Sequence, residues 1–126
     1  MYLLLAGLAA VLIFLYFHYI YRKKSVACLM YHNVFNEKTE GIISEEEFEK
    51  HMEYIKDMKT YKMEELEGMD YILDEKSILV TFDDGYKNNY TKAFPILKKY
   101  NIKATIFLNT AYIENDRDYL DWDEIK

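Results

Sequence analysis

Residues Ser77 to Tyr86 read SILVTFDDGY, and this stretch decides the fold. An apolar and β-branched run, residues 78–82, stops at two adjacent carboxylates, Asp83 and Asp84, and a glycine. A short apolar run bounded by turn residues is typical of a strand buried on both faces of a parallel sheet. Ligands and catalytic groups collect at the carboxyl ends of such strands, so the pattern predicts a site at Asp83 and Asp84.

The two carboxylates have a functional and a structural interpretation. Neighbouring carboxylates repel each other, which favours a bound divalent cation or a shared proton. Asp-Asp-Gly is also an ordinary turn sequence. The buried strand before it favours a functional site, because a plain surface turn does not require that setting.

Further elements are expected along the chain. Residues 26–31 read as a strand, and Ser44 with Glu47 forms a capping box that starts a helix to about Thr60. After the strand that ends at Phe82, a helix is expected over residues 89–100, either kinked at Pro95 or starting later than its pattern. Residues 103–108 read as a third strand. Strands alternating with helices are typical of a parallel α/β fold.

The block TFDDGY, continued by KNNYTKAFPILKKYNIKATIFL to Leu108, resembles the first motif of the polysaccharide deacetylases, the NodB-homology carbohydrate esterases of the family-four type. Residues 29–34, LMYHNV, are similar to the first strand of the membrane-linked and biofilm poly-N-acetylglucosamine deacetylase branch. The resemblance covers about residues 26–126. It implies the amino-terminal part of a distorted parallel (β/α) barrel.

The resemblance also implies an activity and residue roles. The family hydrolyses the N-acetyl amide, a carbon–nitrogen non-peptide bond, of amino sugars in cell-surface or exopolysaccharides, with a divalent metal, expected to be Zn2+. Carried over, Asp83 is the general base and Asp84 a metal ligand, while Tyr86 supports the loop and is a candidate site-lining residue. His32 is not among the family's main ligands. Its place at the end of the first strand makes it a site-lining candidate, with a hydrogen-bonded structural histidine as the alternative.

The family's remaining motifs are expected to be missing. A helical HxxxH pair normally completes the metal site, but the histidines are His18, His32 and His51, whose spacing supplies no such pair. We therefore expect an incomplete domain: a truncated or misassigned reading frame, or a split gene whose other half lies on a separate chain. The alternative is a membrane-anchored, non-catalytic remnant or glycan-binding protein.

The amino-terminal segment changes the expected class of protein. Residues 2–21 carry no formal charge, and as a helix they would be about 30 Å long, enough to cross a bilayer. Arg22, Lys23 and Lys24 follow. A cleaved signal peptide is the rival interpretation, but a basic start and a small-residue cleavage site are both lacking. We expect one transmembrane anchor over residues 1–24, including its basic flank, and a partial deacetylase domain over residues 25–126.

Two arguments disagree about the orientation of this single-pass cell-membrane protein. Three basic residues follow the span and none precedes it, which places the domain in the cytoplasm by the positive-inside rule. The family meets its substrate at or outside the cell surface, so the resemblance places residues 25–126 outside. We follow the resemblance.

The charge of the domain limits its partners. Residues 25–126 carry 13 basic and 22 acidic side chains, which argues against binding to nucleic acid or to anionic lipid. The balance is compatible with an N-acetylated polysaccharide as substrate. Cys28 is the only cysteine, so it cannot form an internal disulfide, and its apolar surroundings in the sequence predict a small core residue.

Overall fold

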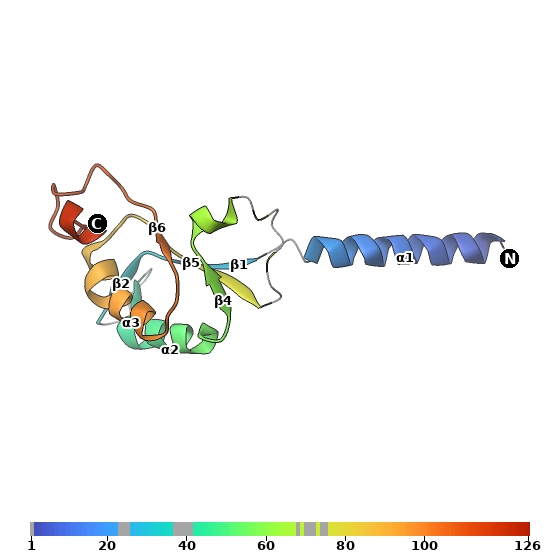
Figure 1. Ribbon diagram of the computed structural model, residues 1–126, viewed down its shortest axis with the longest axis horizontal. Coiled ribbons are helices and arrows are strands. Elements are labelled where there is room, and N and C mark those ends of the chain that lie inside the picture. Colours follow the sequence, from blue (N-terminus) through green and yellow to red (C-terminus); the bar gives the residue numbers. More distant parts are fainter. Residues whose placement is uncertain (1, 23–25, 37–41, 68, 70–72, 74–75) are drawn as a thin grey trace.

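The computed structural model describes residues 2–22, 26–36, 42–67, 69, 73 and 76–126. Figure 1 shows a long amino-terminal helix that projects from an α/β body. The predicted boundary between anchor and domain, at residues 24 and 25, lies outside the described residues, as do Lys23 and Lys24.

Strand β5 is the centre of a parallel sheet. On one side, all of strand β1 pairs with residues 78–82 of β5, from Ala27 opposite Ile78 to Tyr31 opposite Phe82. On the other side, β4 pairs with the beginning of β5 and β6 with its end. The predicted parallel α/β fold is confirmed. The strands are β1 (Ala27–Tyr31), β4 (Lys59–Tyr61), β5 (Ser77–Phe82) and β6 (Thr105–Ile106).

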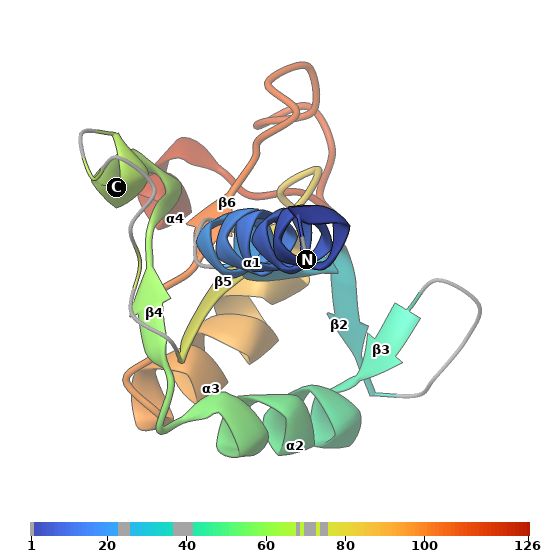
Figure 2. The same cartoon turned by 90° about the vertical axis from the view of Figure 1, so that its right-hand side faces the viewer.

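The helices α2 (Glu45–Ile55) and α3 (Phe94–Lys99) pack on one face of this sheet (Figure 2). The Ser44 hydroxyl accepts a hydrogen bond from the Glu47 N–H at 3.1 Å, which satisfies one of the free donors at the start of α2 as predicted. The apolar side of α2 is buried against alternate residues of β5. The core joins residues from all three elements: Phe48, Met52, Ile55, Ile78, Val80, Phe82, Ile96 and Leu97.

Three expectations about these elements were wrong. Helix α2 ends at Ile55, not at Thr60, because residues 59–61 form β4. Between His32 and α2, where no strand is expected from the sequence, the chain contains two short parallel strands, β2 (Asn33–Phe35) and β3 (Ile42–Ser44). The strand expected over residues 103–108 is shorter in the structure, where β6 contains only Thr105–Ile106. At residues 59–61, pairing with β5 overrides the local helical pattern.

The region around Pro95 follows the second of the two predicted outcomes. Residues Asn89–Ala93 form one π-helical turn, η2, and α3 begins only at Phe94. Pro95 therefore lies in the first turn of α3, directly after the π-helical turn. Two short helical elements complete the described chain, the 3₁₀ turn η1 (Met63–Leu66) and α4 (Trp122–Ile125).

Helix α1 (Tyr2–Arg22) contains the segment that the sequence predicts to be an anchor. Its large apolar side chains are exposed, from Leu5 at 57% to Tyr19 at 58%. Over the residues that the structure describes, no helix is both long and apolar enough to cross a membrane. The spanning role of residues 2–21 thus gains no support from the structure and stays a prediction.

The expected position of Cys28 in the core was wrong, since this residue is exposed. It lies on β1, and its thiol is 3.6 Å from the Thr81 hydroxyl. In the parallel register Cys28 faces the side of the sheet that α2 and α3 do not cover.

Candidate active site at the carboxyl end of β5

Two neighbouring parallel strands bring His32 and Asp83 together. Tyr31 is opposite Phe82 in the register, so the next residue of each chain lies just beyond the same edge of the sheet. The His32 Nε2 and Asp83 Oδ2 atoms are 3.9 Å apart, and the side chains are 42% and 34% exposed. This distance allows an ion pair when the imidazole is protonated but is too long for a hydrogen bond. The structure thus places His32 next to Asp83, and its role as a site-lining residue stays a prediction.

The carboxylates lie on a tight turn. The Asp83 N–H donates to the Tyr31 carbonyl at 2.9 Å, which continues the ladder one residue past β5. The Gly85 N–H then donates to the Asp83 carbonyl at 2.9 Å and closes a three-residue turn. Asp84, its central residue, has φ of 69°. Aspartate tolerates this left-handed region better than most residues, and such conformations cluster at functional sites.

Gly85 is required by this turn for two reasons. Its φ is 76°, which a residue with a side chain rarely adopts. A Cβ atom at this position would also lie 2.7 Å from Leu108 Cδ2. The glycine therefore lets the turn pack directly on the segment that follows β6.

Asn89 is a buried residue that holds the backbone just after β1 in place. This residue is 1% exposed, and its Nδ2 donates to the His32 carbonyl at 2.8 Å. Its Oδ1 has no hydrogen-bond partner among the described residues. The sequence analysis did not single out Asn89, although an amide six residues after Asp83 in the first turn of a buried helix was the available signal.

The segment 109–120 is joined to the carboxylate turn by backbone hydrogen bonds. The Asn109 N–H donates to the Asp84 carbonyl at 3.2 Å, and the Leu120 N–H donates to the Gly85 carbonyl at 2.9 Å. The Lys87 N–H donates to the Asp118 carbonyl at 2.8 Å, and Tyr86 forms an antiparallel bridge with Tyr119. The position of Asp84 therefore depends on this segment.

Three tyrosine rings stack beside the turn. The ring centroids of Tyr86 and Tyr119 are 4.7 Å apart, and those of Tyr119 and Tyr112 are 4.5 Å apart. A hydrogen bond with the Tyr86 hydroxyl, together with burial, raises the pKa of Tyr119 to about 12. Tyr86 is thus at one end of this stack, and its role in supporting the loop stays a prediction. Its two stacking partners had no signal in the sequence.

The described residues do not fit a complete zinc site. Catalytic zinc normally takes three protein ligands. Within the described parts of the chain, no three His, Cys, Asp or Glu side chains come together in a way that could hold a metal ion. Asp84 and its neighbours could supply only part of such a ligand set, so no catalytic step is assigned to a metal here.

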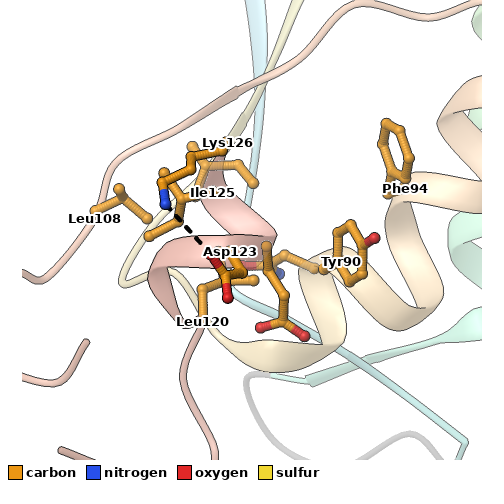
Figure 3. A pocket seen from close by; sticks show the side chains of 10 residues that line it. Tyr90, Phe94, Leu108, Leu120, Asp123, Ile125 and Lys126 are labelled. Atoms are coloured by element: carbon orange, nitrogen blue, oxygen red, sulfur yellow. Dashed lines mark hydrogen bonds and ion pairs between the residues drawn. The ribbon is translucent and has the colours of Figure 1, made fainter. Parts of the chain in front are cut away.

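A separate apolar groove of about 540 Å³ lies between η2, the start of α3 and α4 (Figure 3). Tyr90, Phe94, Leu120 and Ile125 are among its lining residues. Neither His32 nor the two carboxylates line this groove. The candidate active site is therefore at the carboxyl ends of β1 and β5 and not in this groove.

Residues 70–126 match the profile of the polysaccharide deacetylase family. This part of the chain is similar to members of that family. The matched region contains the whole of β5, the carboxylate turn and the stacked tyrosines, so the deacetylase resemblance seen in TFDDGY is confirmed.

Two deacetylase relatives illustrate the sequence similarity. The Bacillus subtilis protein YxkH, provisionally named a polysaccharide deacetylase, is 42% identical over 85 residues, which are 64% of this chain and 30% of the relative. The poly-beta-1,6-N-acetyl-D-glucosamine N-deacetylase of Staphylococcus epidermidis is 49% identical over 39 residues, or 31% of this chain and 14% of the relative.

Solved deacetylase structures share the fold. The Streptococcus pyogenes deacetylase PplD, in complex with acetate, superposes with a TM-score of 0.68 at 28% identity. IcaB from Ammonifex degensii gives 0.68 at 29% identity. The two alignments cover 79% of this chain and 50% and 46% of those structures. The present chain thus spans half or less of the length of these deacetylases.

Proposed function

We propose that this chain supplies the carboxylate turn of a polysaccharide deacetylase that removes N-acetyl groups from the amino sugars of a cell-surface or extracellular polysaccharide. The observation that carries the proposal is the placement of Asp83 beside His32 at the ends of two parallel strands, on a turn held in a left-handed conformation. The names of the relatives support the substrate class. The ligands that the described residues lack would come from a separate chain or a further segment.

The reaction assigns a task to each side chain. Hydrolysis of an N-acetyl amide needs a base that takes a proton from water and an acid that protonates the leaving amine. We assign the first task to Asp83, whose carboxylate is one-third exposed and therefore open to water. A protonated His32 would stabilise the Asp83 carboxylate at their 3.9 Å separation. The acid remains to be supplied from outside the described residues.

The substitution Asp83→Asn tests this assignment. We expect acetate release from N-acetylglucosamine oligomers to fall by about 100-fold or more, the range typical for loss of a general base. The assay uses membranes and extracts of cells that make the full chain natively, because the proposal allows a second chain. Asp57→Asn, an exposed carboxylate in the turn after α2, is the matched control.

Two outcomes would contradict the proposal in different ways. Activity that survives Asp83→Asn would show that another group is the base. If deleting the whole chain leaves acetate release unchanged, the chain does not contribute to deacetylation at all.

We also propose that the complete enzyme depends on one divalent metal, Zn2+ by preference, with Asp84 as one of its ligands. When bound, such an ion would polarise the acetyl carbonyl. Removal of divalent metals by a chelator should abolish acetate release, and Zn2+ should restore it. Full activity in the presence of the chelator would refute the metal requirement.

A second candidate is a non-catalytic glycan-binding protein or remnant. The observation in its favour is that the described residues bring no three metal-ligating side chains together. It predicts that the purified full chain takes up no zinc in a calorimetric titration and still binds the glycan. A tight stoichiometric zinc site in the isolated chain would exclude this alternative.

We further propose that residues 2–21 anchor the protein in the cell membrane and that the domain faces outward. Cys28 offers a direct test, because it is exposed and is the only cysteine. A membrane-impermeant maleimide should label it in intact cells, and Cys28→Ser should remove the label. Labelling only after permeabilisation would place the domain inside, as the positive-inside rule predicts.

A further inference from the structure

A cavity of about 470 Å³ lies between β2, the start of η2 and the segment 116–118. Asn33, Phe35, Tyr86, Asn88 and Arg117 are among its lining residues, and we call it the β2–η2 cavity. Two of its lining residues are sequence neighbours of the candidate active site. Asn33 directly follows His32, and Tyr86 directly follows the Asp83-Asp84-Gly85 turn. The cavity is therefore lined by the residues that come next in the chain after both parts of the candidate site.

Two aromatic residues contribute to the walls of the β2–η2 cavity. Phe35 is 52% exposed although it is apolar. Tyr86 is held in place by stacking on Tyr119, which stacks in turn on Tyr112. Rigid aromatic rings give a large contact area at a low cost in conformational entropy. They suit a ligand that has a flat apolar face, such as the C–H face of a pyranose ring.

The amide groups of the cavity are held in fixed positions. The Asn88 Nδ2 donates to Asn33 Oδ1 at 2.7 Å, and its Oδ1 accepts a hydrogen bond from the Val34 N–H at 3.3 Å. These bonds leave the two donors of the Asn33 amide without a partner among the described residues. Fixed polar groups next to aromatic rings are the usual composition of a ligand site that recognises hydroxyl groups.

The charges in the cavity favour a neutral ligand. Lys87 pairs with Asp121 and Glu124 at 3.1 and 2.9 Å, and Lys92 pairs with Glu45 at 2.8 Å. Arg117 has no ion pair or hydrogen bond among the described residues, and it shares the cavity with Asp118. One unpaired guanidinium next to a carboxylate provides hydrogen-bond donors for a carbonyl oxygen but little net attraction for an anion.

We propose that the β2–η2 cavity is a subsite for a second, neutral N-acetylated pyranose of the polymer, next to the one that lies at Asp83. Phe35 and Tyr86 contact the ring face, Asn33 donates to its hydroxyl groups, and Arg117 donates to its acetyl carbonyl. This inference rests on the proposed function, because that proposal supplies the polymeric substrate. Phe35 and Arg117 are then residues that position and select the glycan.

The test compares glycan binding by four forms of the full chain, kept in the same detergent. The forms are the unsubstituted chain, Phe35→Ala, Arg117→Gln and the control Tyr54→Ala. Tyr54 is an 80% exposed aromatic residue on α2 that does not line the cavity. All three replaced side chains are exposed, so folding should be preserved. Binding of N-acetylglucosamine monomer and trimer is measured by calorimetry or by ligand-observed NMR.

We expect Phe35→Ala and Arg117→Gln each to weaken trimer binding by about three- to tenfold, the effect of one aromatic contact or one hydrogen bond. Tyr54→Ala should bind like the unsubstituted chain. Monomer binding should be the same in all four forms, because a single sugar occupies the site at Asp83. Loss of trimer binding without loss of monomer binding separates a subsite from general damage.

The results that overturn the subsite differ from those that overturn the proposed function. Trimer binding that is unchanged in both variants would refute the subsite and leave the deacetylase proposal standing. Inorganic phosphate that competes with the trimer in the unsubstituted chain but not in Arg117→Gln would show that the cavity is an anion site. If the unsubstituted chain binds no N-acetylated glycan at all, the subsite and its polymer are both refuted, whereas the Asp83→Asn assay judges catalysis separately.

Discussion

The two faces of the central sheet differ in how completely they are covered. On the face with α2 and α3, Val80 and Phe82 are fully buried in a continuous core. On the opposite face, β1 presents Cys28, which is exposed, and Met30, which is 61% exposed. Both faces are formed by the same strands, so strand propensity cannot explain the difference. Only the helix face has packing partners along β1 within the described residues.

This comparison shows where the stability of the described domain comes from. Burial of apolar surface is the main favourable term in folding, and it is concentrated on the helix face. On the other face, Leu79 and Thr81 of β5 are buried, but the neighbouring side chains of β1 remain open. Substitutions on the two faces of the same sheet should therefore have very different costs.

The largest effect is expected at Phe48, which is fully buried between α2 and the sheet. Its ring lies 5.7 Å from Phe82 and 5.0 Å from Tyr31, measured between centroids. Phe48→Ala should lower the free energy of unfolding by about 3–5 kcal/mol, the usual cost of removing a buried aromatic ring. Chemical denaturation of the full chain measures the change. Tyr54→Ala on the exposed side of α2 is the control, and a similar loss there would contradict the assigned faces.

An intermediate effect is expected from Tyr31 at high pH. Burial raises the pKa of Tyr31 to about 12, above the ordinary tyrosine value of 10.0. Between these values the unfolded chain loses the phenolic proton while the folded chain keeps it, so stability should fall as the pH rises through this window. Tyr31→Phe should remove up to about 2 kcal/mol of this decline.

The control for the alkaline effect is Tyr54→Phe, whose ring is exposed. Near neutral pH, Tyr31→Phe should lower the free energy of unfolding by about 1 kcal/mol, because it removes the hydroxyl that forms a 2.9 Å hydrogen bond with His51 Nδ1. Unfolding curves recorded from pH 8 to 12 would show both effects. A decline that is equally steep in Tyr31→Phe would assign it to other groups.

The smallest effect is expected on the open face. Met30→Gln should change the free energy of unfolding by no more than about 0.5 kcal/mol, as is usual for an exposed position. The measurement is the same denaturation experiment, with the fully buried Val80→Asn as its counterpart on the helix face. A loss above about 1 kcal/mol at Met30 would break the comparison, because it would show that this face is covered in solution.

The sequence predicted those parts of the fold that local patterns control. The run that ends at Phe82 and the cap at Ser44 identified β5 and the start of α2, since burial on both faces and capping leave clear signals. The prediction of the helix end failed at Thr60, which continues a helical pattern in the sequence but belongs to β4. Short strands such as β4 depend on pairing with a more distant segment, here β5, and no local pattern reports that partner.

The candidate site was predictable to the same degree. Strand-end reasoning brought His32 and Asp83 to one edge of the sheet, and the register places them there. The stacked rings of Tyr112 and Tyr119 were not predictable, because their contacts arise from an irregular segment that folds back on the turn. Arg117 was missed for the same reason, as its place in the β2–η2 cavity follows from tertiary packing alone.

The hydrogen bond from the Leu120 N–H to the Gly85 carbonyl has an experimental use. Exchange of this amide with solvent deuterium requires the turn and the segment 109–120 to separate, since the bond joins the two. Its protection factor therefore reports the conformational integrity of the Asp83 and Asp84 environment without substrate, metal or assay. An accelerated exchange rate at this one amide would reveal a displaced turn in a variant that otherwise remains folded.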